Sequence, residues 1–335
     1  MTYQRDNFLD SAKALLIFLV ILGHVIGPYR ESNNGNQMMR NIIYLFHMPL
    51  FVFISGYFSK SKDFYKFRKS LFSILESLIF FQILYLIPKL YYSKFQISYL
   101  YTPNWILWYL LSLIFWKTIV FYLPKKFSIY IVIISIILCL LVGFTNVGYE
   151  LSLSRSFVFL PFFILGYYIN EKQLYYIRSY NKIISTIILL FVVLIFINHN
   201  MDLSLVFSGA HSYFITFDNI WLSFSFRVIY LFGATIVGIS ILNLLPTFDF
   251  LARLGSKTIV FYLLHGFFII GMQKMIDIFK LSVELYVLIV FSLFIFVILS
   301  FISSTHMINY LINPVSSFLK LRKSNKGQGI SRSIK

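Results

Sequence analysis

The sequence predicts an all-α polytopic membrane protein, with about ten transmembrane helices around a polar cavity. Of its 335 residues, 59% are hydrophobic and only 12% are charged, whereas a soluble domain carries about twice that share of charge. Apolar runs of roughly 20 residues, the length that spans a bilayer, recur from end to end of the chain. Each run is predicted to be a helix, because an isolated strand cannot satisfy its backbone hydrogen bonds in lipid.

The apolar runs also define the domain organisation. No polar block or Gly/Pro/Ser-rich linker of domain size interrupts them. We therefore expect a single membrane domain over residues 1–320 and a basic cytoplasmic tail over residues 321–335. The predicted spans cover residues 11–28, 41–59, 70–92, 104–123, 127–144, 156–170, 183–198, 219–244, 257–272 and 283–312.

The formal net charge of the chain is strongly positive, at +17. A basic surface would suit nucleic acid, but here the lysines and arginines gather in short segments between apolar runs, mostly on one predicted side. That distribution is typical of cytoplasmic loops. The sequence therefore predicts the lipid bilayer of the cell membrane as a partner, no nucleic acid, and both termini in the cytoplasm. The single cysteine, Cys139, rules out an intramolecular disulfide and a cysteine metal site.

The first predicted span carries two candidate site residues. Lys13 and His24 are about three helical turns apart, so they share a helix face and lie about 16 Å apart along its axis. With a cytoplasmic N-terminus, Lys13 lies near the inner surface and His24 near the outer leaflet. The same spacing fits a snorkelling lysine and a structural histidine that hydrogen-bonds to a neighbouring helix, and this alternative stays open.

Further ionisable residues fall at membrane depth, where their cost makes them candidates for a working site. They are His47 in the second span, Glu76 in the third, Arg155 at the edge of the sixth, Arg227 in the eighth and His265 in the ninth. We expect His24, His47, Arg155 and His265 to face one interior cavity. His199 and His211 are expected outside this group, in an outer loop and without a catalytic role.

Several motifs follow one another along the chain. They are Leu9-Asp10-x-x-Lys13-(x10)-His24, Phe46-His47-Met48-Pro49-Leu50-Phe51-(x3)-Ser55-Gly56-Tyr57, Trp105-Ile106-Leu107-Trp108-Tyr109-Leu110, Arg155-(x5)-Pro161-Phe162-Phe163-Ile164-Leu165-Gly166 and Leu254-Gly255-Ser256-(x5)-Tyr262-Leu263-Leu264-His265. Together, and in this order, they resemble the acyltransferase 3 family of membrane O-acyltransferases, and within it the fucose 4-O-acetylase-like branch. The resemblance covers nearly the whole chain.

Two positions depart from the family pattern. Lys13 stands where the family usually has arginine, which keeps the charge but loses the bidentate fork that grips phosphate. Glu76 lies near a position where the family often has a proline–aromatic pair, after a basic residue that matches Arg68.

The resemblance implies transfer of an acyl group, usually acetyl, from cytoplasmic acyl-CoA to a hydroxyl of an extracytoplasmic or lipid-linked surface polysaccharide. Acyl-CoA is then a donor substrate, and neither a bound cofactor nor a metal is expected. The catalytic residues implied are His24 and Lys13. The residues expected to bind donor or acceptor are Asp10, His47, Arg68, Trp108, Arg155 and His265.

The residue types suit these roles. Lys13, together with Arg68 and Lys69, offers positive charge for the phosphates of coenzyme A. His24 can take the proton of a sugar hydroxyl or carry the acyl group covalently. His47 and Arg155 can orient the acceptor or stabilise an oxyanion, and Trp108 can stack on a sugar or belong to an interfacial aromatic belt.

Two other functional classes remain open at this point. Helices around a polar cavity also suit an exporter of polysaccharide or lipid-linked sugar, although no internal repeat of the kind found in transporters is evident. A membrane scaffold within a capsule-producing assembly is the third possibility. Acyl transfer by the purified protein would separate the enzyme from both.

Overall fold

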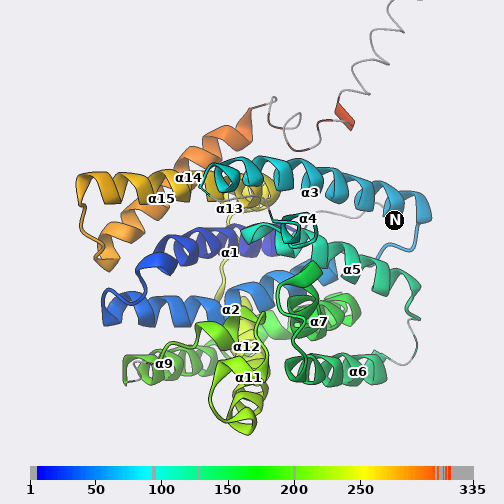
Figure 1. Ribbon diagram of the computed structural model, residues 1–335. Coiled ribbons are helices and arrows are strands. Elements are labelled where there is room, and N and C mark those ends of the chain that lie inside the picture. Colours follow the sequence, from blue (N-terminus) through cyan, green and yellow to red (C-terminus); the bar gives the residue numbers. More distant parts are fainter. Residues whose placement is uncertain are drawn as a thin grey trace, which may run out of the picture.

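The protein is a bundle of helices, shown in Figure 1 as a computed structural model. The structure describes residues 6–92, 96–124, 126, 128–198, 201–305, 308, 312, 314 and 316–317, and this part of the chain contains no strand. The predicted tail over residues 321–335 and the predicted loop residue His199 lie outside the described residues. The all-α membrane fold class is therefore confirmed.

The helices follow one another with short connections. The α-helices are α1 (Asn7–Ile26), α2 (Asn34–Tyr57), α3 (Phe64–Tyr92), α4 (Ser98–Tyr101), α5 (Trp108–Tyr122), α6 (Ser128–Leu141), α7 (Leu153–Tyr168), α8 (Glu171–Ser179), α9 (Lys182–Asn198), α10 (Ser204–Ser208), α11 (Tyr213–Thr216), α12 (Ile220–Leu244), α13 (Asp249–Gly255), α14 (Thr258–Phe279) and α15 (Leu285–Ser304). Short 3₁₀ helices are η1 (Gly27–Tyr29), η2 (Trp105–Leu107), η3 (Val142–Phe144) and η4 (Glu150–Ser152).

A helix lies at each of the predicted spans. Among the described residues, 8 helices are long and apolar enough to cross a membrane by length and composition. The predicted fifth span is the shorter apolar segment Ser128–Phe144, and the predicted seventh span is α9, which is bent by 76° from the polar helix α8 before it. The bend lies between these two helices, where the side chain of Asn181 accepts a hydrogen bond from the backbone N–H of Ile183 and so gives α9 its own start.

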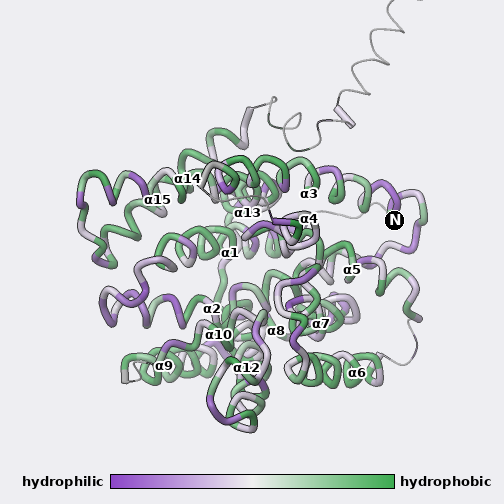
Figure 2. The backbone as a smooth tube through the Cα atoms, in the orientation of Figure 1, coloured by the Kyte–Doolittle hydropathy of each residue, from purple (hydrophilic) through white to green (hydrophobic). Residues whose placement is uncertain are grey.

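Helix α1 runs through the middle of the bundle, as Figure 1 shows, and it contacts α2, α13, α14 and α15. Figure 2 shows that hydrophobic residues cover most of the length of the helices, whereas hydrophilic residues gather mainly in the connections at the two ends. We refer to these ends as the Lys13 end and the Arg30 end, after one residue at each.

Two lysines after α2 join helices at the Lys13 end. The Lys62 ammonium donates to the carbonyl oxygens of Val120, Phe121 and Leu123, at 2.8, 2.7 and 2.8 Å, where α5 ends. The Lys60 ammonium donates to the carbonyl oxygen of Ile169, where α7 ends. Cations stabilise the negative end of a helix dipole, so this loop fixes α5 and α7 relative to α2.

Helices α2 and α7 approach until their backbones touch. A Cβ on Gly56 would lie 2.1 Å from the carbonyl oxygen of Phe163, and a Cβ on Gly166 would lie 1.9 Å from that of Phe53. Only glycine fits at both positions. In a membrane, such small residues permit the close packing that holds helices together, because the lipid supplies no hydrophobic force between them.

We expect Gly166→Ala to destabilise the bundle by roughly 1–3 kcal/mol or more, because the added methyl group meets a backbone carbonyl that cannot rotate away. Gly271→Ala is the matched control, since nothing lies within 4 Å of a Cβ at that position of α14. Thermal unfolding of both variants in detergent measures the difference. A melting temperature of Gly166→Ala equal to that of Gly271→Ala contradicts the role given to this contact.

Candidate active site

A polar cavity of about 760 Å³ lies between the helices toward the Arg30 end. Four of the site residues predicted from the sequence line this cavity: His24, His47, Trp108 and Arg155. Their helices are α1, α2, α5 and α7, so residues far apart in the sequence meet at one site. Other residues that line the cavity were not predicted from the sequence to be site residues. They are Arg30, Arg40, Tyr44, Lys89, Tyr149 and His211.

His24 projects from α1 into a group of aromatic rings. The ring centroids of Trp105, His265 and Tyr44 lie 5.2, 5.4 and 6.5 Å from that of His24. Trp105 has a backbone φ of 38°, a left-handed conformation that is rare for a bulky residue. Such strain is held in place only where the surrounding structure requires it, and it is concentrated at functional sites.

The hydrogen bonds of two histidines determine which nitrogen carries the proton. Nδ1 of His47 lies 2.7 Å from the carbonyl oxygen of Ile43, and Nδ1 of His265 lies 3.0 Å from that of Phe261. A carbonyl oxygen only accepts, so each Nδ1 donates and each neutral ring keeps a lone pair on Nε2. Nε2 of His265 is buried and has no hydrogen-bond partner.

The structure corrects the prediction that His265 faces the same cavity as the other three residues. It is fully buried and lies beside His24, outside the set of residues that line the cavity. The reason is that aromatic rings pack around it: the ring centroids of His24, Tyr262 and Trp105 lie 5.4, 6.2 and 6.4 Å from that of His265. His265 can therefore act on His24 but not on a ligand in the cavity.

Arg155 lies between two aromatic side chains. Its guanidinium carbon is 5.0 Å from the centroid of the Trp108 ring and 4.9 Å from that of Tyr149. Its Nε donates to the carbonyl oxygen of Ser208 at 3.1 Å. Cation–π contacts on both sides hold the guanidinium plane in one position.

His211 corrects a second prediction. It lies in a loop between α10 and α11, as expected, but it lines the cavity, and its Nε2 is 3.2 Å from the Tyr149 hydroxyl. The buried Arg227 of α12 fixes this loop, because its Nη2 donates to the carbonyl oxygen of His211 at 3.3 Å. Burial, and then the charges of Arg155 and Arg227, lower the pKa of His211, so the ring is neutral near pH 7.

Lys13 and Asp10 lie at the opposite end of α1. The Lys13 ammonium is 2.6 Å from a carboxylate oxygen of the buried Asp10. Lys13 lines a second cavity of about 250 Å³, together with Ser55, Tyr109, Lys117 and Tyr262. Arg68 is exposed on α3 and lines a separate cavity of about 540 Å³ with Lys69.

A column of side chains connects the Lys13 cavity with His24. The hydroxyls of Ser55 and Tyr109 are 2.6 Å apart, and the ring centroids of Tyr109 and Tyr262 are 5.5 Å apart. Tyr262 in turn lies 6.2 Å from His265, which lies 5.4 Å from His24. The two ends of α1 are thus joined through aromatic residues of α5 and α14.

Glu76 has a structural explanation. Its two carboxylate oxygens accept hydrogen bonds from the backbone N–H and the hydroxyl of Ser316, at 2.9 and 2.6 Å. The carboxylate therefore attaches a segment after α15 to α3, outside the polar cavity.

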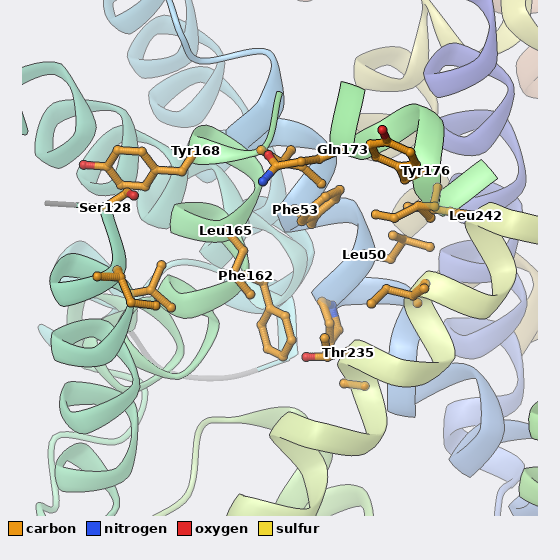
Figure 3. Close-up of a pocket in the computed structure, with 18 residues that line it drawn as sticks. Leu50, Phe53, Ser128, Phe162, Leu165, Tyr168, Gln173, Tyr176, Thr235 and Leu242 are labelled. Atoms are coloured by element: carbon orange, nitrogen blue, oxygen red, sulfur yellow. The ribbon is translucent and has the colours of Figure 1, made fainter. Parts of the chain in front are cut away.

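A further cavity of about 520 Å³ lies between α2, α6, α7, α8 and α12. Figure 3 shows the side chains that face it, among them Leu50, Phe53, Phe162, Leu165 and Leu242. Its described lining includes no histidine and no charged residue. The histidines and charged side chains that could serve an acyl transfer line the polar cavity instead. Within the described residues, no group of three or more His, Cys, Asp or Glu is placed to hold a metal ion.

Comparisons with known proteins agree with this architecture. A family model described as an acyltransferase domain, that of the acyltransferase 3 family, matches residues 6–305. Two similar relatives are both described as nodulation protein NolL. The one from Sinorhizobium fredii is 45% identical over 56 residues, or 16% of this chain and 15% of the relative. The one from Mesorhizobium japonicum is 41% identical over 71 residues, or 17% of this chain and 16% of the relative.

The matched segments therefore span only about a sixth of either relative, and no solved structure matches the chain. The family model, in contrast, covers nearly all of it, and the described helices have the lengths and composition of membrane spans. The chain belongs to the acyltransferase 3 family and is a multi-pass membrane protein.

Proposed function

We propose that this protein is an acyltransferase that moves an acyl group, with acetyl as the simplest case, from cytoplasmic acyl-CoA to a hydroxyl of an extracytoplasmic or lipid-linked surface polysaccharide. The observation that carries the proposal is the placement of Lys13 and His24, on one helix, at two separate cavities joined by a column of aromatic side chains. The donor belongs to the Lys13 cavity and the acceptor to the polar cavity. Family membership favours this enzyme over an exporter or a scaffold.

His24 is the proposed base. Its imidazole takes the proton of the acceptor hydroxyl while the hydroxyl oxygen attacks the carbonyl carbon of the thioester. The C–S bond then breaks, and the leaving thiolate takes the proton from His24. His265 is the proposed positioning residue, because its ring lies 5.4 Å from that of His24 and its Nε2 has no hydrogen-bond partner in the described part of the chain. In an alternative sequence, His24 itself carries the acyl group between donor and acceptor.

The proposed orientation places the Lys13 end and both termini in the cytoplasm of a cell-membrane protein. A reporter active only in the cytoplasm, fused after Lys335, is expected to give a signal. In intact cells a membrane-impermeant maleimide is expected to label Ser32→Cys, an exposed residue at the Arg30 end, but Ser61→Cys only after permeabilisation. The native Cys139 is buried and contributes little background. Labelling of Ser61→Cys alone in intact cells would reverse the orientation.

We expect His24→Ala to lower the rate of acyl transfer by roughly 100-fold or more, because the reaction loses its base. The amount of folded protein is expected to stay near that of the wild type, since the histidine ring is only partly buried. Glycan acylation measured beside protein abundance separates this outcome from a structural role, in which both fall together. Full activity of His24→Ala excludes the ring from the chemistry.

Lys13→Ala is expected to raise the KM for acyl-CoA, because it removes the positive charge that attracts phosphate. Lys13→Arg is expected to leave the KM unchanged, because arginine keeps that charge. Lys13→Ala also takes a partner from the buried Asp10. The double variant Asp10→Asn/Lys13→Ala removes that complication by neutralising both groups. A KM that returns to the wild-type value in the double variant shows that Lys13 serves Asp10 and not the donor.

A further inference from the structure

The polar cavity has a cationic lining. Arg30, Arg40, Lys89 and Arg155 all line it, and its described lining contains no aspartate or glutamate. Charged groups withdrawn from water are strongly unfavourable unless they are paired. A negatively charged ligand would therefore suit this lining, above all beside Arg40 and Arg155.

Two carboxylates touch the edge of this group, and both pair with Arg30. Oε1 of Glu31 lies 2.6 Å from Nη2 of Arg30. Asp202 pairs with Arg30, with Nε of Arg30 3.0 Å from Oδ2. Burial alone would raise the pKa of Asp202, but hydrogen bonds from Ser204 and Arg30 outweigh it and hold the pKa below its ordinary value. Asp202 is thus ionised and already engaged with Arg30.

Arg40 is held close to the proposed base without a full set of partners. Its nearest carboxylate contact is the 3.7 Å approach of Nη1 to Asp202, and its buried Nε and Nη1 have no hydrogen-bond partner. The guanidinium carbon lies 4.3 Å from the centroid of the Tyr44 ring, which packs 4.8 Å from His47. A guanidinium fork with vacant donors is suited to binding a carboxylate or a phosphate group through two oxygens.

Arg155, from α7, is a second cation that lines the cavity. Within the described part of the chain it forms no ion pair, and its hydrogen bond to Ser208 uses only Nε. Its neighbours Trp108 and Tyr149 also line the cavity and give it aromatic surface beside the guanidinium. An anionic sugar would satisfy both the aromatic and the cationic groups at once.

We propose that the polar cavity binds an acidic acceptor, whose carboxylate or phosphate oxygens lie between Arg40 and Arg155 while its hydroxyl faces His24. This inference rests on the proposed function, because it assigns the polar cavity to the acceptor. It deepens that function by naming the substrate class: a glycan with a uronic-acid carboxylate, or one with a phosphate ester. Both groups share the oxyanion that guanidinium forks recognise.

The test compares three sugars with one hexose ring that differ only at C6: methyl glucoside, methyl glucuronoside and methyl glucoside 6-phosphate. Quenching of tryptophan fluorescence in the purified full-length protein reports binding, because Trp105 and Trp108 both line the cavity. We expect at least one acidic sugar to bind about tenfold or more tightly than the neutral one, the effect of one charge-assisted hydrogen bond. Preference for the glucuronoside or for the phosphate identifies which acidic group is recognised. The inference is overturned if the three sugars have equal dissociation constants, or if none of them binds. This test uses the wild-type protein alone.

Variants then locate the preference. Arg40→Gln and Arg155→Gln are each expected to weaken binding of the acidic sugar about tenfold while leaving the neutral sugar unaffected. Arg40→Lys retains part of the preference, because the charge stays but the fork is lost. Arg178→Gln is the matched control, since this arginine lies on α8 against Phe8, away from the polar cavity. Both Gln variants keeping the full preference would place the anion elsewhere.

Acyl transfer from acetyl-CoA to the same sugars separates this inference from the proposed function. Equal transfer rates to neutral and acidic sugars support the function and overturn the inference. Binding that prefers an acidic sugar, without transfer to any of them, supports the inference about the cavity and counts against the function.

Discussion

The contact between the backbones of α2 and α7 determines where the site residues lie. Gly56 and Gly166 allow each helix to reach a carbonyl oxygen of the other, so the distance between the helices is fixed by the main chain and not by side chains that can adjust. Helix α2 carries Arg40 and His47, and α7 carries Arg155. Their positions in the lining of the polar cavity thus depend on a contact near the far end of both helices.

The helices that carry the histidines also determine which ring nitrogen bears the proton. His47 and His265 each donate Nδ1–H to the carbonyl oxygen four residues earlier in their own helix, so the helix itself selects the tautomer. Such a bond leaves Nε2 as an acceptor, directed away from the backbone. Within the described part of the chain His24 has no such bond, and its ring packs beside Trp105, Tyr44 and His265 instead. That difference leaves both its nitrogens available for a proton transfer.

The sequence predicted the helices and part of the site because both depend on local patterns. Hydrophobic runs located every span, and the cost of ionisable groups in lipid identified His24, His47 and Arg155. Arg40, Tyr149 and His211 lie at helix ends or in loops, where a charged or polar residue is unremarkable in sequence. His211 lines the cavity in a loop that Arg227 holds by a hydrogen bond. The positive backbone φ of Trp105 could not be predicted from its residue type. Tertiary contacts decide these positions.

The cations at the two ends of the bundle are used in different ways. At the Lys13 end, Lys60 and Lys62 bind carbonyl oxygens at the ends of α7 and α5, a task for a compact charge with several donors. In the polar cavity, arginines stack on aromatic rings, and Arg40 keeps buried donors without partners. Lys60 and Lys62 therefore use their charge to hold helices together, whereas Arg40 keeps N–H donors that a ligand could bind. An acceptor with paired oxygens would complete the hydrogen bonding that the protein leaves unfinished at that end.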